Sequence, residues 1–590
     1  MPHLSPETTP LTSDQLLVLY KNCRFAEALA LAERLLVAFP DHPALLACAI
    51  DCGLRLAWSA QQEERWSEAE ALYRRLLRLN PHHPETLFRL GYLLQEQNHP
   101  EAETLYRQLL VLQPEQAEAW YNLANLLKQH NRLADAHDAY QQAIRLHPQA
   151  QHARAWQNLG LLLQTMQQND AAKRALQEAI RLEPQHADLH ANLGNLLHKN
   201  GDDAAAEVCY RQALALHPQH KIYLCNLGII LAGQQRISEA EACYRSILQQ
   251  DPQYGDARWN LGLLLLRQER YAEGWACYEA RLLPGQRQHE PPQWSFPQWR
   301  GESLQGLSLL VLCEQGFGDT IQFCRYLPLL RQQGVRRLTL LCPAPLLPLL
   351  HQLPGVDLLS DETPDEQIPP HERWIFLMSI PHCLGASFSL LPLALPYLAA
   401  SSARTANWRN RLPANRLLIG LCWQGSPLHK NDRQRSLSSL RLLAPLWQMT
   451  EVVWVSLQMG EGSTDCAQYA STQPLIELGS QIKDFADTAA ILSLLHGVVT
   501  VDSAVAHLCG ALAKPCWLLL PRYNTDWRWL LERADSPWYP GVMQLFRQES
   551  MGEWQGVIER VMEQMRQTLL PTFSGRADST HPDPNGPVSH

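Results

Sequence analysis

The heptapeptide YNLANLL at 121–127 decides the fold of the first half of this 590-residue chain, because close copies of it recur. In each copy a small residue stands among leucines, as in WQNLGLLL (156–163), HANLGNLL (190–197) and WNLGLLL (259–265). The small residue recurs at Gly91, Ala124, Gly160, Gly194, Gly228 and Gly262. A period of about 34 residues is typical of stacked helical hairpins, where small residues let two helices approach closely.

Two further features keep the same period. Prolines, which a helix tolerates at its start but not in its middle, occur at Pro81, Pro114, Pro148, Pro184, Pro218 and Pro252. Tyrosines recur at Tyr73, Tyr106, Tyr140, Tyr210, Tyr244 and Tyr278, and the fourth unit has Leu176 in their place. The sequence therefore predicts an all-α superhelix over 60–283, with a helical cap or degenerate repeat over 1–59.

The repeated unit resembles the tetratricopeptide repeat family. That resemblance implies a concave groove that binds a protein or peptide partner. The candidate groove residues are asparagines at one repeated position, namely Asn122, Asn158, Asn192, Asn226 and Asn260. Their amides either hold the backbone of a bound peptide or form hydrogen bonds within the repeats, and the sequence leaves both interpretations open.

Helical periodicity stops at 284–306, a stretch rich in Pro, Gln, Gly and Trp. Three large aromatic residues, Trp294, Phe296 and Trp299, stand within it. An unanchored linker would not need such side chains, so we expect an ordered linker that packs onto the next domain.

The second half of the chain alternates short apolar runs with helix-like segments. The runs LSLLVLC (307–313) and RLTLLC (337–342) predict strands buried on both faces, and the pattern restarts with LLIGLCW (417–423). Further strands are expected at 374–380, 452–458, 497–502 and 516–520. This order predicts two α/β lobes with parallel sheets, over 307–400 and 416–560, with ligands bound beyond the strand C-termini. The polar, Pro-rich residues 571–590 are expected to be disordered.

The turn GFGD (316–319) follows the first strand and opens a helix. Gly316 and Gly318 would let the backbone approach a ligand, and a helix N-terminus favours anions. Asp319 is a candidate general base that takes a proton from an acceptor hydroxyl, although an aspartate here also fits a helix cap.

A second turn of this kind is VDSAVAHLCGAL (501–512). Backbone N–H groups at its helix start, with the Ser503 hydroxyl, could hold a diphosphate. His507 is four residues further and lies on the same helix face as Ser503. Asp502 is expected to orient the loop or to bind sugar hydroxyls, while a cap for Asp502 and a core position for His507 are the alternatives.

The loop WQGSPLHKNDRQRSL (423–437) brings cations to a strand end. Lys430 and Arg435 could neutralise a departing diphosphate there, or could be solvated residues of a basic loop. Gln458, at the next strand end, could contact a nucleoside.

Composition excludes several functional classes. The formal net charge of −9 argues against a general nucleic-acid binder. No DxD triplet that would hold a metal with a diphosphate, no HExxH motif and no G-x-S-x-G elbow is present, so we expect neither a metal site nor a hydrolase. The N-terminus has no secretory signal, no apolar run reaches the ~18 residues of a membrane span, and the cysteines have no disulfide-type spacing. These features favour a cytoplasmic protein.

Residues 308–560 resemble the heptosyltransferase-like branch (glycosyltransferase family 9-like) of the two-lobed GT-B glycosyltransferases. The resemblance rests on CEQGFGDTIQFCRYLPLL, GLCWQGSPLHKNDRQRSL, DFADTAAILSLLHGVVTVDSAVAHLCGALAKPCWLLLP and DWRWLLERADSPWYPG. It implies inverting, metal-independent transfer from a nucleotide-sugar, which is a substrate rather than a cofactor. By that resemblance Asp319 is the base, Asp502, Ser503 and His507 form the donor-phosphate turn, and Lys430 and Arg435 belong to the basic loop.

The sequence thus predicts a glycosyltransferase whose acceptor is a protein or peptide held by the repeats. A transferase acting on a glycan or a lipid-linked acceptor, and a non-catalytic interaction scaffold, are the alternatives. The sugar, the nucleotide, the acceptor and the oligomeric state are not written in these motifs.

Overall fold

The computed structural model describes residues 13–146, 153–283, 294–385, 394–429, 431–466 and 475–569. The chain divides into two compact units, Met1–Asn226 and Leu227–His590. The first unit holds helical hairpins, and the second holds the last hairpins together with two parallel β-sheets. The predicted disordered residues 571–590 and the first ten residues of the predicted linker lie outside the described residues.

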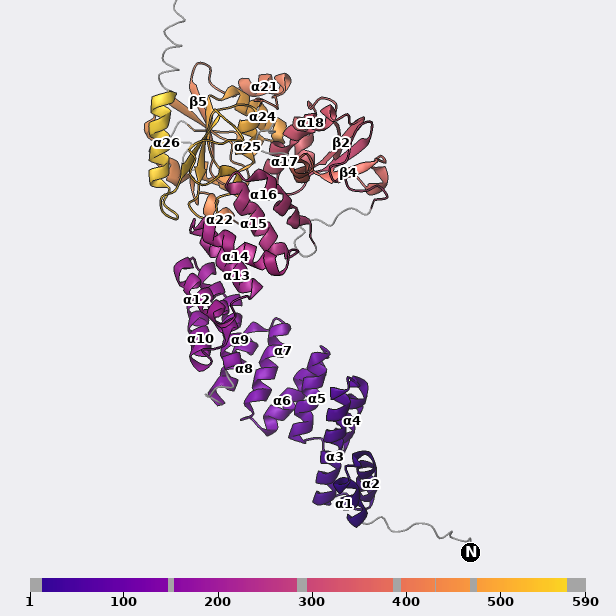
Figure 1. The fold of residues 1–590 in the computed structure, drawn as a ribbon. Coiled ribbons are helices and arrows are strands. Elements are labelled where there is room, and N and C mark those ends of the chain that lie inside the picture. Colours follow the sequence, from indigo (N-terminus) through magenta and orange to yellow (C-terminus); the bar gives the residue numbers. More distant parts are fainter. Residues whose placement is uncertain are drawn as a thin grey trace, which may run out of the picture. The chain divides into compact units, whose positions relative to one another are not determined.

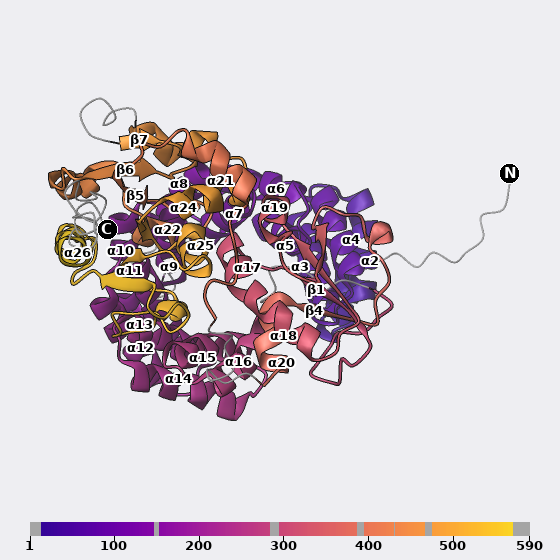
Figure 2. The same cartoon turned by 90° about the horizontal axis from the view of Figure 1, so that it is seen from above.

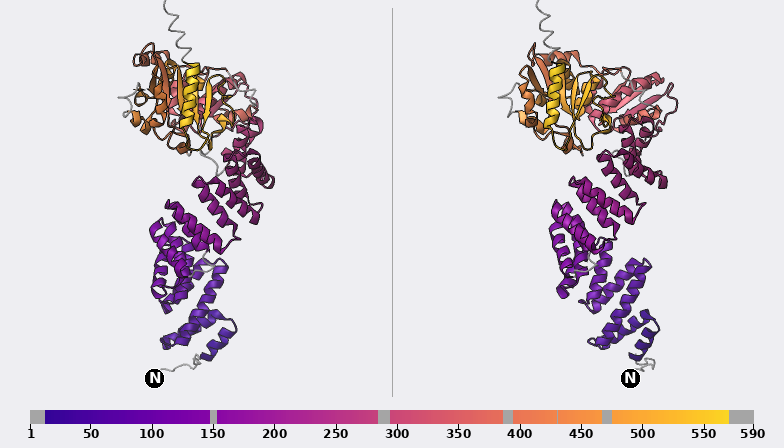
Figure 3. Two further views of the ribbon diagram at one scale, coloured as in Figure 1. Left: turned by 90° about the vertical axis from the view of Figure 1, so that its left-hand side faces the viewer. Right: turned by 60° about the vertical axis from the view of Figure 1, so that its left-hand side comes forward.

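The first unit is a row of antiparallel helical hairpins, seen edge-on in Figure 1 and from two further sides in Figure 3. Its helices are α1 (Ser13–Lys21), α2 (Phe25–Ala38), α3 (Pro43–Gln62), α4 (Trp66–Leu79), α5 (Pro84–Glu96), α6 (Glu101–Leu112), α7 (Ala117–Gln129), α8 (Leu133–Leu146), α9 (Ala153–Thr165), α10 (Asn169–Leu182), α11 (Ala187–Lys199) and α12 (Asp203–Leu216). Helix α3 runs through residue 59, where we placed the end of the cap. It pairs with α4, so the first hairpin of the array starts at Pro43.

Packing within each hairpin explains the repeated small residue. A Cβ added at Gly91 would lie 3.1 Å from the ring of Tyr106, and one added at Gly194 would lie 3.1 Å from the ring of Tyr210. Both tyrosines are fully buried, so each ring fills the space that the missing side chain leaves. In the fourth repeat Leu176 takes the tyrosine position and packs against Gly160. Burial of these stripes between neighbouring helices stabilises the array.

Helix α3 is the one described helix long and apolar enough to cross a membrane by length and composition alone. Its residues Ala49 and Cys52 are buried in a core shared with α2 and α4. A core helix of a repeat has the same composition, so α3 gives no clear transmembrane span.

The second unit begins within α13 (Lys221–Gly233), which is followed by α14 (Ile237–Gln250), α15 (Gly255–Arg267), α16 (Tyr271–Tyr278) and a 3₁₀ turn, η2 (Glu279–Leu282). Trp275 and Tyr278 of α16 belong to the same buried cluster as Phe323 and Trp538 of the α/β part. The last hairpin therefore shares a hydrophobic core with the α/β region.

The first sheet is parallel, with the order β3-β2-β1-β4. Its strands are β1 (Ser308–Leu312), β2 (Arg337–Cys342), β3 (Asp357–Ser360) and β4 (Arg373–Phe376). Leu310 of β1 pairs with Thr339 of β2 on one side and with Trp374 of β4 on the other. The helices that accompany it are α17 (Phe317–Phe323), α18 (Leu327–Gln332), α19 (Leu347–Leu350) and α20 (Ile380–Cys383).

The second sheet is also parallel, with the order β10-β9-β8-β5-β6-β7, and its β5, β6 and β7 edge is visible in Figure 2. Its strands are β5 (Leu417–Cys422), β6 (Val452–Ser456), β7 (Leu475–Glu477), β8 (Gly497–Val501), β9 (Cys516–Leu520) and β10 (Met543–Arg547). The helices are α21 (Ser402–Arg409), α22 (Asp432–Arg435), α24 (Phe485–Leu494), α25 (Ala504–Ala511) and α26 (Gln555–Thr568). Helix α26 covers one face through Val557, Ile558 and Val561.

The α/β region therefore contains two parallel sheets, as expected. The order reverses between β1 and β4 in the first sheet and between β5 and β8 in the second. In doubly wound sheets, ligands bind in the crevice outside the strand C-termini at such reversal points. The loops that leave β1, β4, β5 and β8 are thus the places to look for a site.

The described part of the linker packs as expected. Trp294 and Phe296 stack with ring centroids 5.2 Å apart, against a small core that includes Leu310 and Trp374. The backbone N–H of Trp299 donates to the carbonyl of Trp374 at 2.8 Å.

Three expectations about elements were incomplete. Strands β3, β7 and β10 lie at or beside sheet edges and are absent from the predicted set, because their residues are only half buried and give no continuous apolar run. One of the expected helix-like segments, after β5, is a 3₁₀ helix over Leu440–Gln448 with Pro445 inside it. Another, after β1, begins at Phe317 and is broken by a 3₁₀ turn at Cys324–Tyr326.

Candidate functional site

The loop after β1 places Asp319 in the first turn of α17. The Asp319 Oδ2 accepts a hydrogen bond from the backbone N–H of Gly316 at 2.8 Å. Its Oδ1 forms an ion pair with Arg528, which lies 209 residues further along the chain. Asp319 thus both caps its turn and pairs with a cation of the distant segment. Burial raises the pKa of Asp319, and the positive charge of Arg528 opposes that shift.

Arg528 is the centre of a buried polar cluster that the sequence analysis missed. Besides Asp319, its guanidinium donates to Gln322 Oε1 at 2.5 Å and to both carboxylate oxygens of Asp526 at 3.0 Å. It also lies 4.4 Å from the ring centroid of Trp527. Burial alone would raise the pKa of Asp526, but the attraction of Arg528 outweighs it and lowers that pKa. The hint in the sequence was the stretch DWRW (526–529), in which two opposite charges alternate with two tryptophans.

Helix α17 of the first sheet and helix α25 of the second sheet touch at their N-terminal ends. A Cβ added at Gly318 would lie 2.7 Å from Cδ2 of His507 and 3.5 Å from the Cα of Ala504. Gly318 is therefore required by this close approach rather than by a left-handed backbone. The sequence predicts that this glycine lets a ligand approach the backbone. In the structure, the group that lies against Gly318 is the side chain of His507.

His507 lies in the core. Its Nδ1 is 2.9 Å from the hydroxyl of Tyr539, and its ring stacks on Trp529 at a centroid distance of 5.1 Å. Burial, assisted by the nearby charge of Arg528, lowers the pKa of His507 to about 3. The imidazole is therefore neutral at physiological pH and can serve only as a hydrogen-bonding and packing group there.

Asp502 and Ser503 connect β8 to α25 at the reversal point of the second sheet. Burial and the charge of Asp526 raise the pKa of Asp502 to about 6, against the opposing influence of Arg435. The Ser503 hydroxyl lies 3.2 Å from Thr500 Oγ1. Because Asp502 senses Asp526, Arg435 and Arg528, these four residues share one electrostatic environment.

The basic loop after β5 contributes Arg435. Its Nε is 3.3 Å from Asp432 Oδ1, and its side chain is 12% exposed. A Cβ added at Gly425 would lie 2.6 Å from its guanidinium, so the loop folds back over the strand end. Lys430, also predicted for this loop, lies outside the described residues.

Gln458 lies just after the end of β6, as expected. It is buried, and its Oε1 accepts hydrogen bonds from the backbone N–H groups of Trp423 at 3.0 Å and Gln424 at 2.9 Å. Its Nε2 donates to the carbonyl of Met459 at 3.1 Å. Gln458 therefore ties the end of β6 to the loop after β5 and has its polar atoms engaged within the protein.

The crevice at the end of β1 and β4 contains a second cluster that the sequence did not suggest. Arg281, from the 3₁₀ turn after the last repeat, donates to Glu314 at 2.7 and 3.0 Å and to Ser379 Oγ at 2.7 Å. Both members of the Arg281–Glu314 pair are about 95% buried. The array thus reaches the reversal point of the first sheet and fills part of it with its own ion pair.

Two of the candidate groove asparagines, Asn158 and Asn226, belong to a hydrogen-bonded ladder in the first unit. Asn158 Nδ2 donates to Asn125 Oδ1 at 3.1 Å, and the Tyr140 hydroxyl donates to the same oxygen at 2.6 Å. The arrangement recurs where Asn226 and Tyr210 both donate to Asn195. These contacts favour hydrogen bonding within the repeats for Asn158 and Asn226. Asn122 is buried, and Asn260, which lies in the second unit, has a partner of its own.

Asn192 differs from its counterparts. Its neighbours in the preceding repeat are Leu161 and Leu176, whereas the repeats that precede Asn158 and Asn226 supply Asn and Tyr at these two positions. It is only half buried, and no ladder contact to either position is chemically possible. Of the predicted groove amides in the first unit, Asn192 is therefore the one that best fits contact with a bound partner.

Within the described residues, no group of three or more His, Cys, Asp or Glu side chains is arranged to hold a metal ion.

Comparison with known proteins identifies the helical region. Residues 54–117, 92–151, 121–164, 158–221 and 225–286 match the tetratricopeptide repeat model. The helical region is built of tetratricopeptide repeats. Protein FlbA of Caulobacter vibrioides is 27% identical over 316 residues, which cover 49% of this chain and 51% of that protein. The chain therefore spans about half the length of the curated relative it matches.

Solved tetratricopeptide structures resemble parts of the array. PilF of Pseudomonas aeruginosa is 19% identical and covers 35% of this chain and 94% of its own, with a TM-score of 0.32. YrrB, described as a tetratricopeptide-repeat protein with an unusual peptide-binding site, is 24% identical and covers 30% of this chain and 90% of its own, with a TM-score of 0.27.

Proposed function

We propose that this chain is a glycosyltransferase with two GT-B lobes, which moves a sugar from a nucleotide-sugar to an acceptor presented by its tetratricopeptide repeats. The observation that carries the proposal is the cluster around Arg528. Through Arg528, a partly buried carboxylate from the helix after β1, Asp319, shares one electrostatic environment with Asp502 and Arg435 at the reversal point of the second sheet.

The proposed chemistry is a single displacement. The Asp319 carboxylate takes the proton of an acceptor hydroxyl, whose oxygen then forms a bond to the anomeric carbon of the donor sugar. The bond from that carbon to the diphosphate breaks, and the nucleoside diphosphate leaves with the electron pair. A raised pKa makes Asp319 a better proton acceptor than an ordinary carboxylate.

The leaving diphosphate requires positive charge at the end of β8. Arg435 supplies a guanidinium there, and the Ser503 hydroxyl with the backbone N–H groups that begin α25 supplies further donors. Arg528 neutralises the carboxylates of Asp319 and Asp526, so the donor would not meet uncompensated negative charge. We expect Arg528 to be a positioning residue, because its contacts are all to protein groups.

The repeats support binding of a protein or peptide, because tetratricopeptide arrays are interaction modules. Asn192, the amide outside the ladder, is a candidate contact to such an acceptor. An acceptor that is a glycan or lipid-linked sugar would leave the array free to bind an assembly partner instead.

A non-catalytic scaffold is the second candidate function. It is favoured by the ion pair that engages Asp319 and by the buried, fully bonded amide of Gln458. A scaffold of this kind would bind partners through the repeats and would show no donor binding at the end of β8.

A thermal-shift screen of UDP-, GDP-, ADP-, CMP- and dTDP-sugars separates these functions. A ligand that binds only the native state raises the melting temperature as its concentration exceeds its dissociation constant. We expect a shift with one nucleotide class that is lost in Ser503→Ala and in Arg435→Gln. Ser480→Ala, an exposed serine bonded to Glu477, is the matched control and should keep the shift.

Asp319→Asn completes the test. In a glycosyltransferase this variant should still bind the donor but should lose transfer to a peptide acceptor by about 10²–10⁴-fold, the usual contribution of a general base. Absence of any nucleotide-dependent shift in the wild type would instead favour the scaffold.

A further inference from the structure

A cavity of about 180 Å³ lies within the second unit, and neither Asp319 nor Ser503 lines it. Its walls come from the last repeats, through Gly233 and Arg267, and from the loops after β9 and β10, through Arg522 and Gln548. Each of these segments is far from the others in sequence, so the cavity exists only because the array packs on the α/β region.

The charges around this cavity have one sign. Three arginines line it, Arg267, Arg522 and Arg547, and the lining contains no Asp or Glu. Within the described residues, no ion pair joins any of the three to a carboxylate. Nearby repeat arginines behave differently, since Arg245 and Arg270 both pair with Glu241. The cavity therefore collects positive charge, and the carboxylate that acts on Arg267, Asp526, is itself paired with Arg528.

Three buried donors on the lining residues have no hydrogen-bond partner, namely Arg267 Nε, Arg547 Nε and Gln548 Nε2. A buried donor without a partner is rare, because it loses its hydration without compensation. The corresponding electrostatic penalty is visible in Arg547, whose pKa burial lowers to about 10, and in Arg267, whose pKa burial also lowers. An anion in the cavity would relieve both effects.

The protein holds these groups in place without using their free donors. Arg267 Nη2 donates to the carbonyl of Thr525 at 2.6 Å, and the Arg547 Nη atoms donate to the carbonyls of Arg533 and Trp529. Gln548 Oε1 accepts from the backbone N–H groups of Arg522 and Gly552. In each case the unused atom is the one left over after the side chain has been fixed.

We propose that this cavity is a binding site for a phosphate-class oxyanion, either inorganic phosphate or the phosphate of a small monoester. Arginine is suited to such ligands because its planar donors match the oxygens of phosphate. The volume is well above the ~10–15 Å³ that one water requires, so a polyatomic anion fits. The anion would join the last repeats to the loops of the second sheet.

The test uses the full chain and two probes, inorganic phosphate and glycerol 3-phosphate. Binding is measured by calorimetry and by thermal shift, against sodium chloride at matched ionic strength. We expect saturable binding that chloride does not reproduce. The probe with the lower dissociation constant shows whether the site takes the free ion or a monoester.

Variants assign the binding to this cavity. Arg522→Gln, at an exposed side chain, and Arg267→Gln should each raise the dissociation constant at least tenfold. Arg533→Gln is the matched control, because Arg533 is paired with Glu269 and Asp535 and does not line the cavity. Should Arg267→Gln fail to fold, Arg522→Gln alone decides.

Ser503→Ala distinguishes this proposal from the proposed donor site. Binding that persists in Ser503→Ala and is lost in Arg522→Gln supports the cavity, even if no nucleotide-sugar ever binds. Two results would overturn the proposal: no binding beyond the chloride control, or binding that is lost in Ser503→Ala and unchanged in Arg522→Gln.

Discussion

At the scale of single residues, the candidate site is governed by burial of titratable groups. His507 and Asp502 lie five residues apart at the start of α25. Burial lowers the pKa of His507 to about 3 and raises the pKa of Asp502 to about 6. Both shifts disfavour the charged state, because the loops of the two sheets exclude water from the same region. The two groups therefore act on stability with opposite signs.

His507 makes the protein sensitive to acid. The unfolded chain protonates this imidazole near pH 6.5 while the folded chain does not, so stability falls as the pH drops from about 6.5. We expect His507→Gln to lose less stability than the wild type between pH 7 and pH 4.5 in urea unfolding. An equal slope in the two proteins would contradict the burial of a neutral imidazole.

Asp502 should show the reverse. Its folded pKa exceeds the unfolded value of about 3.9, so the folded state binds the proton more tightly and gains relative stability as the pH falls from about 6 to about 4. Asp502→Asn removes that gain. The free energy of unfolding of this variant should therefore fall more steeply than that of the wild type as the pH drops. The comparison with His507→Gln at identical pH values is the internal control.

For the proposed glycosyl transfer, with Asp319 as the proposed base, the ion pair between Asp319 and Arg528 sets the expected pH dependence. A general base must be ionised, so activity should fall on the acid side as the pH drops through the pKa of Asp319. Arg528→Gln removes the charge that opposes the upward shift, and the acid limb of kcat/KM should then move to higher pH. A lower rate with an unmoved limb would show that Arg528 acts only on structure.

At the scale of elements, hairpins differ in how well the position of their small residue accommodates a larger side chain. A Cβ at Gly91 would meet only the side-chain ring of Tyr106, at 3.1 Å, and Ala124 already occupies the equivalent position against Tyr140 in the next repeat. A Cβ at Gly262 would instead meet the backbone of α16, 2.8 Å from the nitrogen of Tyr278 and 3.0 Å from the carbonyl carbon of Cys277. Backbone in a packed hairpin cannot move aside as a ring can.

We therefore expect Gly262→Ala to destabilise the protein by about 1–3 kcal/mol, the usual range for overpacking. Gly91→Ala should be near neutral, since alanine also improves helix propensity by up to ~1 kcal/mol. Chemical denaturation of the two variants side by side checks the pair. Equal losses of unfolding free energy in the two variants would contradict the difference in packing between these two hairpins.

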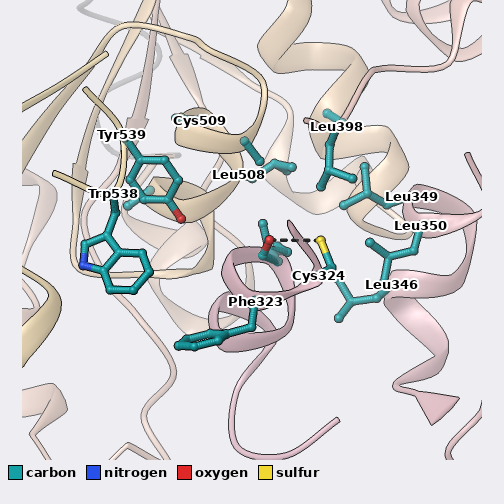
Figure 4. Close-up of a cluster of buried hydrophobic side chains, with 14 of the residues drawn as sticks. Phe323, Cys324, Leu346, Leu349, Leu350, Leu398, Leu508, Cys509, Trp538 and Tyr539 are labelled. Carbon is teal, nitrogen blue, oxygen red and sulfur yellow. Dashed lines mark hydrogen bonds between the residues drawn. The ribbon is translucent and has the colours of Figure 1, made fainter. Parts of the chain in front are cut away.

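At the scale of the whole molecule, the chain is two units whose cores differ. The first unit, Met1–Asn226, is a repeat array in which each hairpin contacts its neighbours, whereas the second, Leu227–His590, shares one large core among the last repeats and both sheets. Figure 4 shows that core where Phe323 and Cys324 lie near Leu508 and Tyr539. Such a chain should not unfold in a single step.

The buried pair Arg281–Glu314 tests this division. Arg281→Met leaves Glu314 and Glu279 without their cation, which typically costs about 3–5 kcal/mol. Hydrogen exchange should accelerate in β1, β4 and α16 and stay unchanged in α5–α10. Arg245→Met, which breaks a half-exposed pair with Glu241, is the matched control and should cost about 1 kcal/mol or less. Acceleration throughout the array would contradict two separate units.

The sequence by itself determined the elements whose burial is local. The 34-residue period fixed the hairpins, because Gly, Tyr and Leu pack against near neighbours in the chain, and the continuous apolar runs fixed the central strands β1, β2, β5, β8 and β9. Strands β3, β7 and β10 gave no such signal, since they are half exposed. The positions of Asp502 and Ser503 directly after β8, and of Asp319 at the start of the helix that follows β1, were also predictable from the order of apolar runs and turns.

Only the tertiary structure decided how distant charges meet. Asp319 pairs with Arg528 across 209 residues, and Arg281 of the array pairs with Glu314 of the first sheet. A single charged residue forms no periodic pattern, so the local sequence does not indicate its partner. The arginine-lined cavity has the same origin: its walls come from segments that approach one another only after the last repeats pack against the second sheet.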